Sequence, residues 1–101
     1  MIKHIVFFGI KDEAEGKSKA ENMQIIKEEL ESLVNIIPQV KKLEVGFNHP
    51  EAPVDNVDLV IYSEFDSMDD LHTYMVHPEH KKAASYITKV RTSRACIDYE
   101  V

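Results

Sequence analysis

The sequence holds a single cysteine, Cys96, and only three glycines, Gly9, Gly16 and Gly46, which stand apart from one another. One cysteine cannot form an intramolecular disulfide, so we expect a reducing, cytoplasmic location and a small buried or half-buried side chain at this position. Isolated glycines provide no loop that could cradle a phosphate group. We therefore expect no nucleotide or flavin cofactor.

Positive charge and long apolar runs are also scarce. The formal net charge is −6 and the basic residues form no long run. Nucleic acid and anionic membranes repel such a chain, so neither is expected as a partner. The most apolar stretch, Ile2 to Ile10, contains Lys3 and His4 and is too short for a secretory signal or a membrane span. It is better explained as a β-strand.

The apolar content is high enough for a folded core. Apolar residues make up 44% of the 101 residues, which predicts one domain over residues 1–101. Four segments have the pattern of β-strands: Ile2–Gly9, Lys42–Asn48, Val57–Phe65 and Arg94–Val101. The first and third are apolar on both faces, which predicts that both of their faces are covered.

Two helical regions separate these strands. The first opens at Ser18, with Glu21 at the spacing of a capping box. We expect it to end at Pro38, because the residue before a proline avoids the α conformation. The second opens at Ser67 and is expected to kink or break at His77–Pro78.

The resulting order, β-α-β-β-α-β, is that of the ferredoxin-like fold, an α+β arrangement. A four-stranded antiparallel sheet then carries its helices on one face. The other face would expose the apolar side chains of Ile5, Phe7, Val60 and Tyr62. A contiguous exposed patch usually marks a partner interface. We therefore predict a homodimer through this open sheet face, with two sheets packed together.

Several separated motifs resemble those of one known family. They are Met1-Ile2-Lys3-His4-Ile5-Val6-Phe7-Phe8, Leu43-Glu44-Val45-Gly46, Asp58-Leu59-Val60, Phe65-Asp66-Ser67, Tyr74-Met75-Val76-His77-Pro78-Glu79-His80 and Asp98-Tyr99. With these motifs, essentially the whole chain resembles the stress-responsive A/B-barrel (Dabb) family. The resemblance implies a dimeric α+β barrel.

The same resemblance implies candidate site residues. Members include plant stress proteins without assigned chemistry and polyketide cyclases, which close a linear poly-β-ketone by aldol condensation without a cofactor. Resemblance to the cyclase pocket places catalytic candidates at His4, Tyr74 and His80. Two pocket positions differ, since a tyrosine of the first helix falls on Leu30 and a histidine of the third strand falls on Leu59. Whether these leucines close the pocket is left open.

The residues themselves allow more than one interpretation. His4 lies among apolar neighbours and is either a core histidine with one hydrogen bond or part of a pocket. His77 can accept a backbone N–H at the start of the helix that follows Pro78. Tyr74 and His80 bracket the helix break and suit enolate chemistry, in which the histidine removes a proton beside a carbonyl and the phenol hydrogen-bonds the oxyanion.

A metal site is a third interpretation of the same segment. His77 and His80 flank Glu79, but no further histidine follows at a suitable spacing. We expect no required metal ion.

Three functions follow from these patterns. The chain is a protein that binds a small carbonyl-bearing ligand between sheet and helices, a cofactor-free cyclase- or lyase-like enzyme, or a non-catalytic dimeric stress or assembly protein. For the first two we predict that His4, Tyr74 and His80 share one polar corner of a mostly apolar pocket.

Overall fold

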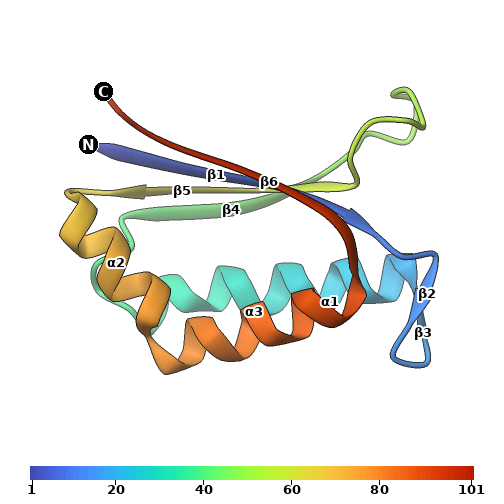
Figure 1. The fold of residues 1–101 in the computed structure, drawn as a ribbon, viewed down its shortest axis with the longest axis horizontal. Helices are drawn as coiled ribbons and strands as arrows, with labels where there is room; N and C mark the ends of the chain where they lie inside the picture. Colours follow the sequence, from blue (N-terminus) through green and yellow to red (C-terminus); the bar gives the residue numbers. More distant parts are fainter.

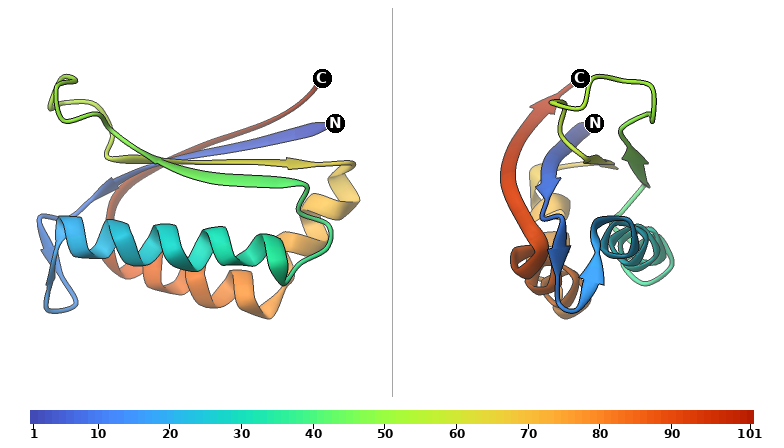
Figure 2. Two further views of the ribbon diagram at one scale, coloured as in Figure 1. Left: turned by 180° about the vertical axis from the view of Figure 1, so that it is seen from behind. Right: turned by 90° about the vertical axis from the view of Figure 1, so that its right-hand side faces the viewer.

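The computed structural model describes all residues, 1–101, and its main sheet has four antiparallel strands in the order β4-β5-β1-β6 (Figure 1). The strands are β1 (Ile2–Ile10), β4 (Lys42–Phe47), β5 (Leu59–Phe65) and β6 (Arg91–Glu100). The helices are α1 (Lys19–Ser32), α2 (Met68–Val76) and α3 (Pro78–Val90), with a 3₁₀ turn, η1 (Leu33–Asn35), after α1. All of them lie on the same side of the sheet (Figure 2). The predicted ferredoxin-like fold is confirmed.

The first helical region starts as predicted and ends earlier. Ser18 and Glu21 form the capping box, in which each side chain accepts from the backbone N–H of the other. The α-helix ends at Ser32 rather than at Pro38. The reason is that the Leu33 carbonyl accepts from the N–H groups three and four residues later, which tightens the chain into a 3₁₀ turn. None of the helices combines the length and the apolar content that crossing a membrane requires.

The core lies between the sheet and the helices. Nineteen buried apolar side chains form one cluster. The sheet contributes alternate residues of each covered strand, such as Val6 and Ile61, and the helices contribute Leu30, Leu71 and Ile87. This alternation places His4 on the covered face of β1, two residues from Val6, where its side chain is buried.

The opposite face of the sheet carries no helix. Its apolar side chains, which we call the open-face patch, are Ile5, Phe7, Val60, Tyr62, Ile97 and Tyr99. Each is half-buried or exposed, and Ile97 is 55% exposed. The ammonium groups of Lys3 and Lys42 each lie 5.6 Å from the ring centroid of Tyr62. Charged side chains therefore border the patch at this tyrosine.

Strand β6 is longer and more exposed than predicted. It begins at Arg91 rather than Arg94 and forms one edge of the sheet. Cys96 is exposed, so the predicted burial of this side chain is wrong. The physical reason is that an edge strand has a neighbour on one side only.

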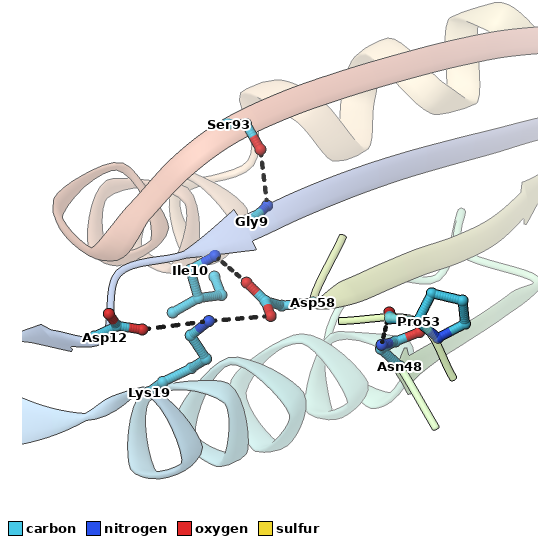
Figure 3. A network of polar contacts seen from close by, with 8 residues as sticks. All are labelled: Gly9, Ile10, Asp12, Lys19, Asn48, Pro53, Asp58 and Ser93. Carbon is cyan, nitrogen blue, oxygen red and sulfur yellow. Dashed lines mark hydrogen bonds and ion pairs between the residues drawn. The ribbon is translucent and has the colours of Figure 1, made fainter. Parts of the chain in front are cut away.

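The end of β1 is held by polar contacts with distant segments (Figure 3). Asp58 accepts from the backbone N–H of Ile10 at 2.6 Å and from the Lys19 ammonium group at 3.2 Å. The backbone N–H of Gly9 donates to the Ser93 hydroxyl, and a Cβ at Gly9 would meet that oxygen at 2.7 Å. Asp58, part of a family-like motif, thus ties β1 to the start of α1.

The predicted loop from Lys11 to Lys17 contains a small hairpin. Its strands are β2 (Glu13–Ala14) and β3 (Lys17–Ser18), paired antiparallel. Glu15 and Gly16 form the turn with positive φ angles of 53° and 72°. A two-residue turn of this kind suits the twist of a hairpin, which the polar composition alone did not reveal.

Candidate functional site

A cavity of about 180 Å³ lies between the covered face of the sheet and the helices. Most of its lining is apolar: Val6, Phe8, Leu30, Ile61, Met75, Ala84 and Ile87. Its polar lining residues are His4, Tyr74, His80, Thr88, Arg91 and Arg94. The lining comes from β1, α1, β5, α2, α3 and β6, so the cavity depends on the whole fold.

The structure brings the three predicted site residues together. The ring centroids of Tyr74 and His80 are 4.4 Å apart, and those of Tyr74 and His4 are 6.4 Å apart. Phe65 packs beside them, with its centroid 5.0 Å from that of Tyr74. All three predicted residues line the same cavity. A catalytic role for them stays a prediction.

The break between α2 and α3 positions His80. Pro78 has no N–H to continue the helix, and the next N–H, that of Glu79, donates to Nδ1 of His77. The carbonyl of Met75, one turn earlier, is then free to pair with Nδ1 of His80 at 3.1 Å. His77 is thus the structural cap that the sequence suggested.

This contact determines which ring nitrogen of His80 is basic. A carbonyl oxygen can only accept, so Nδ1 must carry the proton and donate it. Burial lowers the pKa of His80, an effect that the bond to Met75 partly opposes and that positive charge on His4 or His77 would strengthen. At neutral pH the ring is therefore uncharged, and Nε2 is a free proton acceptor.

Tyr74 presents an unpaired hydroxyl. The residue is 1% exposed, yet its hydroxyl has no hydrogen-bond partner in the protein. No fully enclosed side-chain oxygen or nitrogen lacks a partner in this structure. The hydroxyl must therefore open onto the cavity that the residue lines. Burial raises the pKa of Tyr74 far above its ordinary value of 10.0, so the phenol remains a neutral donor.

His4 is held by a carboxylate from the far end of the chain. Its Nδ1 is hydrogen-bonded to Asp98 on β6, the residue directly opposite His4 in the strand register. A carboxylate oxygen accepts, so Nδ1 of His4 carries a proton and donates it. Both alternatives foreseen for His4 therefore apply, since it makes a structural hydrogen bond and also lines the cavity.

The two leucines that differ from the cyclase pattern lie in different places. Leu30 lines the cavity and is buried, but it does not fill it. Leu59 is buried outside the cavity lining, opposite Phe8 on β1 and Phe47 on β4. On β5 the lining residue is Ile61. An aliphatic side chain at Leu59 thus leaves the cavity unchanged, whereas Leu30 makes its wall apolar.

One group of potential metal ligands adjoins the site. Ligand atoms of His4, Cys96 and Asp98 all lie within 4.8 Å of one another. Nitrogen, sulfur and carboxylate oxygen are ligands that zinc accepts. An ion there would have to displace the proton between His4 and Asp98, a hydrogen bond that by itself explains why these side chains are close. The two histidines weighed as metal ligands from the sequence, His77 and His80, make backbone contacts.

Sequence reasoning missed several lining residues. Arg91 and Arg94 lie where α3 passes into β6, beyond the motif that identified His80. Thr88 also lines the cavity, and its hydroxyl donates to the Ala84 carbonyl. A signal for the arginines was present, because the chain contains no others.

Comparison with known proteins places this geometry in a family. The sequence matches the model of the stress responsive A/B barrel domain over residues 2–101. A crystal structure of a dimeric protein of unknown function with a ferredoxin-like fold, from Bacteroides fragilis NCTC 9343, is 39% identical. The match covers 99% of this chain and 95% of that one, with a TM-score of 0.87. Among curated proteins, none matches the chain.

Two less similar structures share the fold. A dimeric ferredoxin-like protein of unknown function from Thermobifida fusca YX is 23% identical, with a TM-score of 0.84 over 99% of this chain and 90% of that one. A hydroxynitrile lyase from Passiflora edulis is 21% identical, with a TM-score of 0.77 over 97% and 90%. At these identities the likeness concerns the fold alone. From the family match and the Bacteroides relative, the chain belongs to the stress-responsive A/B-barrel domain family, as its motifs indicated.

Proposed function

We propose that this protein binds a small carbonyl-bearing ligand in the cavity and moves a proton at the carbon beside the carbonyl. The observation that carries the proposal is the Tyr74 hydroxyl, which has no protein partner and opens onto the cavity although the residue is only 1% exposed. Its donor is therefore open to a molecule in the cavity. A ligand oxygen could accept from it.

The proposed proton transfer uses Tyr74 and His80 together. Nε2 of His80 takes a proton from the carbon next to the carbonyl, the C–H electron pair becomes the C=C bond of an enolate, and negative charge develops on oxygen. The Tyr74 hydroxyl donates to that oxygen and stabilises the charge. Return of the proton from His80, or attack of the enolate carbon on a second carbonyl, completes a reaction without a cofactor.

His4 would act as a fixed polar wall of the site. Asp98 orients its ring by a hydrogen bond to Nδ1. Only Nε2 is therefore available to a ligand. In the neutral ring Nε2 carries no proton, so it can accept a hydrogen bond from a ligand hydroxyl but cannot donate to the carbonyl oxygen that Tyr74 binds. We therefore assign His4 a positioning role and His80 the role of base.

The cavity limits the size of the ligand. An apolar cavity of about 150 Å³ accommodates a benzene ring, so a cavity of about 180 Å³ suits a monocyclic or short-chain carbonyl compound. Its mainly apolar lining favours a ligand with an apolar body and few polar atoms.

We further propose that the protein is a homodimer through the open-face patch. The patch includes Ile97, which is 55% exposed, and Phe7, which is 37% exposed. Apolar surface of this kind is unfavourable in water unless a partner covers it. The Bacteroides relative, 39% identical, is described as dimeric. Packing of two such sheets would leave both cavities on the outer, helical sides, one per protomer. A non-catalytic protein would form the same dimer, but this alternative does not explain why the Tyr74 hydroxyl faces the cavity without a protein partner.

Acetophenone tests the proposal, because it has a ring, a carbonyl and exchangeable methyl protons. Titration into isotope-labelled protein should shift the amide resonances of the cavity residues, while ethylbenzene, which lacks the carbonyl, should bind more weakly. In D₂O the protein should accelerate deuterium incorporation into the methyl group, and His80→Asn should abolish this acceleration. Binding without deuterium exchange would refute the proposed proton transfer and leave only the proposed ligand binding. Absence of shifts at the cavity would refute the proposal for uncharged carbonyl ligands.

A further inference from the structure

The chain has only two arginines, and both line the cavity. Ten of its twelve basic side chains are lysines, distributed along the sequence, whereas Arg91 and Arg94 lie three residues apart. On a solvated surface, lysine serves as well as arginine. Arginine is preferred where a planar fork must meet a carboxylate or phosphate.

Neither arginine is neutralised by the protein. The five ion pairs of the structure use His4 and lysines only. Arg94 has the thiol of Cys96 nearby, but a thiol offers no compensating charge. A guanidinium group is always charged, and Arg91 is half-buried. Two unpaired cations at one cavity of a chain with net charge −6 are suited to an anionic ligand.

The arginines lie at the opposite end of the cavity from Tyr74 and His80. In the sheet, Asp98 is opposite His4 and Arg94 is opposite Phe8. His4 and Phe8 are four residues apart on β1, which is about 13 Å at the strand's rise of about 3.3 Å per residue. Between them the wall is apolar, formed by Val6 on β1 and Ile87 on α3, among others.

We propose that the ligand carries a carboxylate as well as a carbonyl. The carboxylate binds Arg91 and Arg94, an apolar segment of about one ring crosses the middle, and the carbonyl reaches Tyr74. This inference rests on the proposed function and specifies its ligand class. A doubly charged phosphate suits the site less well than a singly charged carboxylate, because the carbonyl end of α3, at Val90, opposes two negative charges more strongly than one.

Two probes of nearly the same shape separate the effect of the ligand's negative charge from the effect of its fit to the cavity. The probes are 4-acetylbenzoate and 4-acetylbenzamide, which share the ring and acetyl group and differ in whether the para group is charged. Calorimetric or NMR titration should show the carboxylate binding about tenfold more tightly or better, since hydrogen bonds to a charged partner are roughly twice as strong. The preference should shrink as salt is raised.

Variants identify the residues responsible. Arg91→Gln and Arg94→Gln should each reduce the preference for 4-acetylbenzoate, and the double variant should bind both probes alike. Lys82→Gln removes one positive charge from α3 outside the cavity lining and should keep the preference. The melting temperature of each variant checks that it is folded.

The outcomes separate the two proposals. Equal binding of both probes at the cavity by the unmodified protein would overturn the carboxylate inference and leave the proposed function standing. An equal loss of preference in Lys82→Gln and the arginine variants would overturn it too, because the effect would then come from net charge. If neither probe binds, both proposals fail.

Discussion

The ring of His80 lies beside the ring of Tyr74, with 4.4 Å between their centroids, although the two residues belong to different helices. The short break at His77 and Pro78 makes this possible. It places a base with a free Nε2 next to a phenol whose hydroxyl has no protein partner.

The Tyr74 hydroxyl should matter for ligands and not for stability. Tyr74→Phe removes a group that makes no protein hydrogen bond, so the free energy of unfolding should change by less than about 0.5 kcal/mol. Binding of acetophenone should weaken, and any catalysed exchange should slow by ~10²-fold, as expected for loss of an oxyanion donor. Urea unfolding and NMR titration measure the two effects.

Tyr86 provides the matched control. Its hydroxyl donates to the buried side chain of Asn22 at 2.5 Å, outside the cavity lining. Tyr86→Phe should therefore cost on the order of 1 kcal/mol of stability and leave ligand binding unchanged. The reverse pattern in the two variants would show that Tyr74 has a structural role only.

His80 should make stability depend on pH. Burial lowers its pKa below the ordinary value of 6.5, so between the folded pKa and pH 6.5 the unfolded chain binds a proton that the folded chain does not. The free energy of unfolding should therefore be fully retained above about pH 7 and fall as pH decreases through this window. His80→Asn keeps a donor for the Met75 carbonyl and should flatten the profile.

The comparison requires unfolding free energies at several pH values for three proteins. His72→Asn alters an exposed histidine of α2 and should retain the wild-type slope. If His80→Asn and wild type lose stability in parallel as the pH falls, the burial of His80 does not govern this dependence.

The open-face patch should be the dimer interface. Val60→Asp puts a charge in the middle of it, which would be buried without a partner in the dimer, so light scattering should show dissociation to monomers or loss of the fold. Val54→Asp makes the same chemical change at a residue that is 98% exposed in a loop and should leave the oligomeric state unchanged. The interface should bury more than roughly 1,000 Å² in total. A stable wild-type monomer at micromolar concentration would contradict this prediction.

No metal should be needed for folding. Protein purified without added metal and dialysed against a chelator should keep its melting temperature. Should an ion survive dialysis in stoichiometric amount and raise the melting temperature on return, the group formed by His4, Cys96 and Asp98 is where it would bind. Cys96→Ser would then reduce the effect.

The fold was predictable because its signals are local. The capping box of Ser18 and Glu21, the second cap at Ser67 and the break at Pro78 each depend on residues within a few positions. Strand boundaries were reproduced to within about three residues, and the largest difference, the early end of α1, came from backbone bonds to Leu33 that the sequence does not specify.

The site was less predictable because it is assembled from distant segments. The motif around Tyr74 and His80 identified the residues, but the tautomer of His80 follows from a carbonyl that only the helix break sets free. The pairing of His4 with Asp98 depends on the register of two strands 94 residues apart, which periodicity does not give. Arg91 was missed because it precedes the predicted start of the last strand.

The place of β1 in the sheet has a consequence for how the protein is made. This central strand is synthesised before its neighbours, β5 and β6, which follow about 50 and 80 residues later. At a ribosomal rate of 5–20 residues per second, roughly ten seconds pass before β6 emerges. During this interval an apolar strand lacks both partners and is open to wrong association. The pocket around His4 cannot exist on the growing chain and forms only after synthesis has passed Asp98.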